Sequence, residues 1–203
     1  MKIVIVDYGM GNIRSIISSL NYIGLDNIVV SANFDVLKSA DKLILPGVGS
    51  FGIAMSQIIE KKLDKYLNEI VLENNKPLLG ICLGMQLLGN SSTEDGYNKG
   101  LGFVNAYCDK FDNTKITVPH VGINQVKTDN SLKIYDGFKS ESDFYFTHSY
   151  KMKSEDQINQ CYCNYEIDFI ASFEFKNIAG VQFHPELSQK NGLKLLKNFI
   201  DKF

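Results

Sequence analysis

What the sequence lacks excludes several classes of protein. It has no excess of one charge, since 21 basic side chains are balanced by 23 acidic ones and the formal net charge is -2. Without a basic surface, neither nucleic acid nor anionic lipid is an expected partner. The first apolar run, Ile3-Val4-Ile5-Val6, is too short for a signal peptide or a membrane span. We therefore expect a cytoplasmic protein that acts on a small molecule or binds another protein.

Cysteine is scarce, and its four copies lack the spacing of a disulfide framework: Cys82, Cys108, Cys161 and Cys163. A reducing compartment would keep them as thiols. No second pair of Cys or His stands at ligand spacing from Cys161 and Cys163, which favours two packed thiols on one strand face over zinc. We expect no metal and no cofactor.

The length and the apolar patterning predict one α/β domain spanning residues 1–203. In the first half, short apolar runs alternate with amphipathic stretches, which predicts a mostly parallel sheet with crossover helices. The expected strands cover 2–6, 27–30, 42–45 and 77–81. After about residue 100 strand patterns dominate, at 121–126, 143–147, 158–164, 168–175 and 178–183, and are expected to continue or flank the sheet.

Helices are expected where apolar residues recur with the helical period. The longest such pattern runs from 53 to 72, and the others cover 13–23, 85–88 and 192–203. The turn Gly9-Met10-Gly11 before the first helix lacks the third glycine of a dinucleotide fingerprint, because Arg14 occupies that position. Nucleotide binding is therefore disfavoured.

A nucleophile elbow is predicted at Gly80-Ile81-Cys82-Leu83-Gly84, where an apolar strand meets a short helix. A residue on such a turn has a strained backbone, and only small residues two positions to either side let the turn close. The start of the helix and a nearby imidazole would both favour the thiolate of Cys82. A lone cysteine is more often a small buried residue, but the flanking glycines favour the catalytic interpretation.

His184 is the best candidate base among three histidines. It ends the run 180–183 and is followed by Pro185 and Glu186. Because residues two apart in extended chain project to one side, Glu186 is expected to hold one ring nitrogen while the other faces the thiol. The alternative is a surface His-Pro-Glu at a strand end. His120, expected in a loop, and His148, expected in a strand on the core, have no acid two residues away and are interpreted as structural.

A glycine-rich segment, Pro46-Gly47-Val48-Gly49-Ser50-Phe51-Gly52, follows the strand at 42–45. Its glycines permit unusual backbone angles and close approach of a ligand to the main chain. An ordinary turn or a phosphate nest would also fit. No Lys-Ser/Thr pair follows, so the P-loop interpretation fails.

Together these elements resemble the class I (triad) glutamine amidotransferases, a flavodoxin-like α/β family. Within that class they are most similar to the glutaminase subunits of imidazole glycerol phosphate synthase from histidine biosynthesis. The matching motifs run nearly end to end, at residues 7–12, 46–52, 80–88, 119–122, 145–150 and 180–186.

The resemblance implies hydrolysis of glutamine to glutamate and ammonia by Cys82, His184 and Glu186. The backbone N–H groups of Val48 and Leu83 would form the oxyanion hole. Glutamine would be held by a further set, Gly49, Gln86, Glu94, Ser149 and Tyr150. The partner would be a (β/α)8 barrel synthase (cyclase) subunit in a heterodimer, which receives ammonia and forms imidazole glycerol phosphate and AICAR.

Two departures from the family pattern affect the gate between subunits, to which Tyr145 also belongs in the family. Ile123 stands where the family usually has Trp, and Leu187 where it usually has Lys or Arg. They leave open a paralogous glutaminase that supplies ammonia for amidination of a surface or flagellar sugar, with a barrel paralogue and an ATP-dependent amidating enzyme. Two weaker hypotheses are an inactive regulatory protein and a peptidase or stress protein of the same superfamily, which would lack the His-Pro-Glu run.

Overall fold

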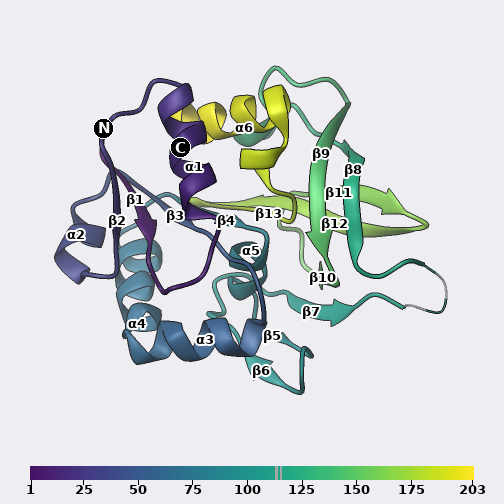
Figure 1. Cartoon of the computed structure of the whole chain (residues 1–203), viewed down its shortest axis with the longest axis horizontal. Helices are drawn as coiled ribbons and strands as arrows, with labels where there is room; N and C mark the ends of the chain where they lie inside the picture. Colours follow the sequence, from purple (N-terminus) through teal and green to yellow (C-terminus); the bar gives the residue numbers. More distant parts are fainter. Residues whose placement is uncertain (113, 115) are drawn as a thin grey trace.

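One large sheet carries the fold. The computed structural model describes residues 1–112, 114 and 116–203. Within these residues nine strands form a sheet in the order β2-β1-β3-β4-β13-β12-β11-β8-β9 (Figure 1). The parallel strands are β1 (Ile3–Val6), β2 (Ile28–Ser31), β3 (Lys42–Leu45), β4 (Leu78–Ile81) and β13 (Ile178–Val181). This confirms the expected α/β class, although the last strand ends two residues earlier than expected.

An antiparallel extension continues the sheet beyond β13. Its strands are β12 (Ile167–Phe175), β11 (Gln160–Tyr165), β8 (His120–Lys127) and β9 (Glu141–His148). The three strands farthest from β13, which are β11, β8 and β9, alternate buried and more exposed side chains; in β9, for example, Phe144 and Phe146 are buried while Asp143 and Thr147 are exposed. In β12, which lies next to β13, six consecutive residues are buried, as in most of the parallel strands. The antiparallel portion expected after residue 100 is therefore present in the same sheet.

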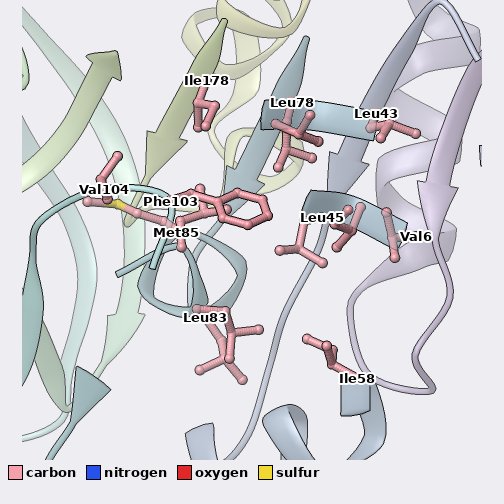
Figure 2. Close-up of a cluster of buried hydrophobic side chains, with 14 of the residues drawn as sticks. Val6, Leu43, Leu45, Ile58, Leu78, Leu83, Met85, Phe103, Val104 and Ile178 are labelled. Atoms are coloured by element: carbon pink, nitrogen blue, oxygen red, sulfur yellow. The ribbon is translucent and has the colours of Figure 1, made fainter. Parts of the chain in front are cut away.

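Helices cover both faces of the parallel strands, which explains their uninterrupted apolar runs. Ile3 and Ile5 face α1 (Ile13–Tyr22) and α6 (Gln189–Lys202). Val4 and Val6 face the opposite side, covered by α2 (Phe34–Lys38), α3 (Phe51–Glu60), α4 (Leu63–Leu67) and α5 (Leu83–Leu87) (Figure 1). Figure 2 shows part of this second cluster, where Met85 of α5 lies beside Phe103. Each large aliphatic side chain buried in this way contributes about 1.5–3 kcal/mol.

The prediction of one continuous helix over 53–72 is wrong. The segment divides into α3, α4 and a π-helical stretch, Asn68–Glu73. Lys62 adopts the left-handed conformation, with φ 58°, and turns the chain between α3 and α4. The apolar positions followed the helical period on both sides of the break, so periodicity alone did not reveal it. Ile59 is 57% exposed, which shows that the buried stripe is interrupted there.

A small second sheet was not predicted. It contains β10 (Tyr150–Lys153), β7 (Tyr107–Lys110), β5 (Ser91–Ser92) and β6 (Asn98–Lys99), in that order. Strands of two to four residues are too short to show an alternating pattern. The short helix α2 was also missed; its cap is Asn33, whose side chain accepts hydrogen bonds from the backbone N–H groups of Asp35 and Val36. Two 3₁₀ turns, Lys133–Tyr135 and Pro185–Leu187, complete the elements of the described residues.

Gly84 provides a test of how tightly α5 packs against the sheet. A Cβ atom at this position would collide with the carbonyl oxygen of Leu45, which is backbone and cannot move aside. We expect Gly84→Ala to lower the free energy of unfolding by about 3 kcal/mol, measured by urea denaturation. Ser56→Ala, an exposed change in α3, is the control and should stay within about 0.5 kcal/mol. Equal stability of the two variants would contradict this packing.

Candidate active site

The candidate site lies where three neighbouring parallel strands end. In β3, β4 and β13 the register pairs Leu45 with Gly80, and Ile81 with Val181. Carboxyl ends of adjacent parallel strands are the usual place for ligand sites in such sheets. A cavity of about 200 Å³ opens there, and its lining includes Val48, Gly49, Cys82, Leu83, Gln86, Thr147, His148, Ser149, Tyr150 and His184.

Cys82 occupies the turn between β4 and α5 with strained backbone angles. Its φ is 52° and its ψ is -112°, a region that residues with a side chain rarely adopt. A Cβ on Gly80 would lie 2.9 Å from the backbone carbon and oxygen of Gly84, so the two glycines approach each other as the elbow prediction requires. The Cys82 side chain is 5% exposed and borders the cavity.

His184 and Glu186 form a buried pair. Nδ1 of His184 lies 2.8 Å from Oε1 of Glu186, and the two side chains are 4% and 0% exposed. The expected pairing is therefore present, but the expected reason for it is wrong. Only His184 is extended, with φ -98° and ψ 97°, whereas Glu186 belongs to the 3₁₀ turn that begins at Pro185. The turn, rather than a shared strand face, brings the carboxylate back to the ring.

The charges around His184 favour its protonated form. Burial alone would lower the pKa of His184, but the Cys82 sulfur and the Glu186 carboxylate both favour the imidazolium and raise the pKa to about 10. Nε2 is buried and, among the described residues, has no hydrogen-bond partner beyond its electrostatic contact with that sulfur. The ring can therefore hold a proton beside the sulfur of Cys82.

Glu94 lies near the residues expected to hold substrate but outside the cavity lining: burial raises the pKa of Tyr150, and the charge of Glu94 adds to that rise. Oε2 of Glu94 accepts a hydrogen bond from the backbone N–H of Phe51 at 2.7 Å, at the first residue of α3. Burial raises the pKa of Glu94, and this hydrogen bond opposes that rise. Gly49, Gln86, Ser149 and Tyr150 line the cavity, whereas Glu94 does not.

The three residues expected at the partner gate lie together. Ile123 of β8 pairs directly with Tyr145 of β9, and both line a cavity of about 190 Å³ with Leu187. Ile123 is 60% exposed and Leu187 is 44% exposed. The carbonyl oxygen of Tyr145 accepts a hydrogen bond from the backbone N–H of His184 at 2.8 Å. Tyr145 therefore lines this second cavity and is directly hydrogen-bonded to the main chain of His184.

The other two histidines form a buried neutral pair. Nδ1 of His120 lies 2.9 Å from Nε2 of His148, and burial lowers their pKa values to about 4 and about 3, respectively. His120 is the first residue of β8 and not part of a loop, which corrects the expectation from sequence. His148 borders the cavity beside Cys82.

Two polar contacts were missed by sequence reasoning. Nδ2 of Asn12 donates to Oε1 of Glu186 at 3.2 Å, and Nε2 of Gln182 lies 3.7 Å from Sγ of Cys82. Asn12 stood within a recognised motif but had no assigned role. Gln182 precedes His184 by two residues in an extended run, a signal that places both side chains on one side of the chain.

Residues 1–112, 114 and 116–203 contain neither a metal-binding cluster nor a membrane-spanning helix. No group of three or more His, Cys, Asp or Glu side chains there is arranged to hold a metal ion. Across the same part of the chain, every helix is too short or too polar to cross a bilayer. All four cysteines are free and buried.

The fold and the site define an α/β protein with a cysteine on a nucleophile elbow and a His-Glu pair beside it. The family model for "Glutamine amidotransferase class-I" matches residues 4–203. The chain belongs to the class-I glutamine amidotransferase family, which makes it a glutamine amidotransferase enzyme.

Several relatives and a solved structure are similar over nearly the whole chain. "Imidazole glycerol phosphate synthase subunit HisH 2" of Vibrio vulnificus is 46% identical, covering 99% of this chain and 94% of that protein. The HisH 2 subunit of Methanococcus maripaludis is 48% identical, covering 98% of both chains, and the HisH 1 subunit of the same organism is 42% identical at the same coverage. The structure of PurLQS from Thermotoga maritima has a TM-score of 0.75 at 18% identity, covering 98% of this chain and 97% of that one, and supports the fold.

Titration of His184 tests the proposed electrostatics. We expect its imidazole to lose a proton near pH 10 in the intact protein, followed by histidine ring NMR. Cys82→Ala removes the negative partner that favours the imidazolium, so the pKa of His184 should fall in this variant. His120 and His148 are internal references, because burial keeps both neutral over this range of pH. An unchanged His184 pKa in the variant would show that the sulfur does not act on the ring.

Proposed function

We propose that this chain is a glutaminase subunit, one domain over residues 1–203, that hydrolyses glutamine through Cys82, His184 and Glu186. The observation that carries the proposal is the convergence of a strained cysteine, a buried His-Glu pair and a glycine-rich loop at the ends of β4, β13 and β3. Four free cysteines are consistent with a reducing, cytoplasmic location.

The geometry supports a two-stage hydrolysis. The Cys82 thiolate attacks the side-chain amide carbon of glutamine, and the carbonyl electron pair moves onto oxygen. His184 then gives its Nε2 proton to the departing nitrogen, ammonia leaves, and a thioester remains on the sulfur. In the second stage a water attacks the thioester while His184 takes its proton, and glutamate leaves with the bond pair returning to sulfur. Glu186 keeps the ring oriented throughout by its bond to Nδ1.

The oxyanion would be stabilised from two segments. Leu83 is the first residue of α5, so its N–H has no partner within the helix, and the residue lines the cavity. The second donor would be the N–H of Val48, in a loop where Gly49 has φ 94°. In our proposal the peptide between Gly47 and Val48 turns its N–H inward when the partner binds. Loss of one such donor costs about 2.7–4 kcal/mol, so the isolated subunit should be slow.

For the partner we propose a (β/α)8 barrel synthase (cyclase) subunit in a heterodimer, with imidazole glycerol phosphate and AICAR as products in histidine biosynthesis. The names of the full-length relatives, each a subunit of imidazole glycerol phosphate synthase, support this choice. Ammonia would leave the cavity at Cys82 and enter the barrel past Tyr145.

A second pathway remains a specific alternative. The exposed gate residues Ile123 and Leu187 are both apolar, unlike the usual family pattern. This observation favours a paralogous subunit that supplies ammonia for amidination of a surface or flagellar sugar, with a barrel paralogue and an ATP-dependent amidating enzyme.

Replacing the nucleophile tests the chemistry. With its partner, Cys82→Ala should lose glutamine-dependent turnover by about 10⁴-fold or more, because no thioester can form. Partner binding and synthesis from added ammonium should persist. Cys163→Ala removes another buried thiol far along the chain, on β11, and should keep glutamine hydrolysis. Glutamine hydrolysis that survives in Cys82→Ala would remove the triad assignment.

Partner choice is tested by mixing the purified subunit with each candidate barrel. The cognate barrel should raise glutaminase turnover by about 100-fold or more, the value of one recovered oxyanion donor. Activation by the histidine-pathway cyclase supports the first assignment. Activation by the sugar-pathway barrel alone would replace it with the second.

A further inference from the structure

A line of buried hydrogen bonds ends on the Cys82 sulfur from inside the protein. Nε2 of Gln86 lies 3.0 Å from the backbone oxygen of Tyr150 and 2.9 Å from Oε1 of Gln182, and Nε2 of Gln182 lies 3.7 Å from Sγ of Cys82. Gln182 is 0% exposed and does not line the cavity, whereas Gln86 does. The contact on the sulfur is therefore separate from the face that meets substrate.

The direction of each bond in this line is fixed by its partners. A backbone oxygen only accepts, so Gln86 must present its nitrogen to Tyr150. The two protons of that nitrogen are used by Tyr150 and by Oε1 of Gln182. Gln182 therefore presents its oxygen to Gln86 and its NH₂ group to Cys82. The network determines this amide orientation, which the electron-rich sulfur also favours.

Main-chain hydrogen bonds anchor the residues that carry the donor and the sulfur. The N–H of Gln182 donates to the carbonyl of Ala171 in β12 at 2.8 Å, and the N–H of Cys82 donates to the carbonyl of Val181 at 2.7 Å. Ile81 of β4 pairs with Val181 of β13, and Cys82 and Gln182 are the residues that follow them. The side chains of Cys82 and Gln182 therefore project from the ends of two neighbouring strands. Neither bond requires substrate or partner to form.

We propose that Gln182 donates a hydrogen bond to the Cys82 thiolate and holds the nucleophile ionised and oriented through both stages of hydrolysis. This inference rests on the proposed role of Cys82. A donor aimed at the sulfur favours the anion over the thiol. His184 gives up its proton to the leaving ammonia, whereas Gln182 keeps its protons. The N–H donor of Gln182 is therefore still available when the thioester C–S bond breaks and the electron pair returns to sulfur.

A purely structural role is the competing explanation, because Gln182 also ties β13 to α5 through Gln86. Two variants separate the explanations. Gln182→Met keeps the approximate volume and removes the donor. Gln182→Glu keeps an oxygen for Gln86 and places a second oxygen against the sulfur. Gln125→Met, on the exposed side of β8, is the matched control.

The experiment follows alkylation of Cys82 by iodoacetamide against pH, with the modified peptide quantified by mass spectrometry. The other cysteines serve as unreactive references, since burial raises the pKa of Cys163 to about 12 and that of Cys108 further. We expect the midpoint for Cys82 to move upward by about one pH unit in Gln182→Met, equivalent to about 1.4 kcal/mol, and further in Gln182→Glu. Gln125→Met should leave it unchanged.

Folding of each variant is checked by circular dichroism before alkylation. Should Gln182→Met fail to fold, Gln182→Glu, which keeps the bond from Gln86, carries the test. An unshifted midpoint for Cys82 in a folded variant overturns the proposal. If the stability of that variant has also fallen, Gln182 has only a structural role. Alkylation needs neither glutamine nor partner, so this outcome is distinct from failure of the glutaminase assignment, which the turnover of Cys82→Ala reports.

Discussion

The parallel pairing of β3, β4 and β13 is the constraint on which the site depends. The register places Ile81 beside Val181, and the N–H of Cys82 continues the ladder to the carbonyl of Val181 at 2.7 Å. Residues 82 and 184 are distant in sequence, yet each follows its strand by only a few residues. A slip of this register would carry the histidine away from the sulfur and turn every side chain of the strand to the other face.

The same pairing explains how a strained residue persists. The positive φ of Cys82 costs of order 1–3 kcal/mol, and such strain survives only where the surroundings fix it. Here β4 is hydrogen-bonded on both sides, and α5 is pressed so close to the sheet that Gly80 and Gly84 tolerate no Cβ. Rigid packing of α5 against the sheet thus fixes the orientation of the Cys82 side chain.

The parts of the site that are encoded by adjacent residues were predictable from the sequence. The contacts between residues far apart in the chain were not. The elbow around Cys82 and the pair formed by His184 and Glu186 are encoded within five adjacent residues each, so sequence reasoning found them. Glu94 was placed by resemblance alone, and its bond to Phe51, 43 residues away, has no local signature. The break at Lys62 was hidden because apolar spacing continues across it. The parallel strands were predictable because burial on both faces leaves an unbroken apolar run.

Main-chain hydrogen bonds join the surface around Ile123, Tyr145 and Leu187 to the candidate site, which limits what the proposed partner must do. Tyr145 accepts from the N–H of His184, and its own N–H donates to Oγ of Ser188, which in turn donates to the carbonyl of His184. Ile123 and Leu187 flank this loop of bonds and are exposed. A partner that covers both apolar side chains gains from their burial, but only a difference in that gain between two conformations shifts the site. Affinity for this surface and any effect on Cys82 are therefore separable properties. A partner that binds without favouring one arrangement of the 184–188 turn would leave the position of His184 unchanged.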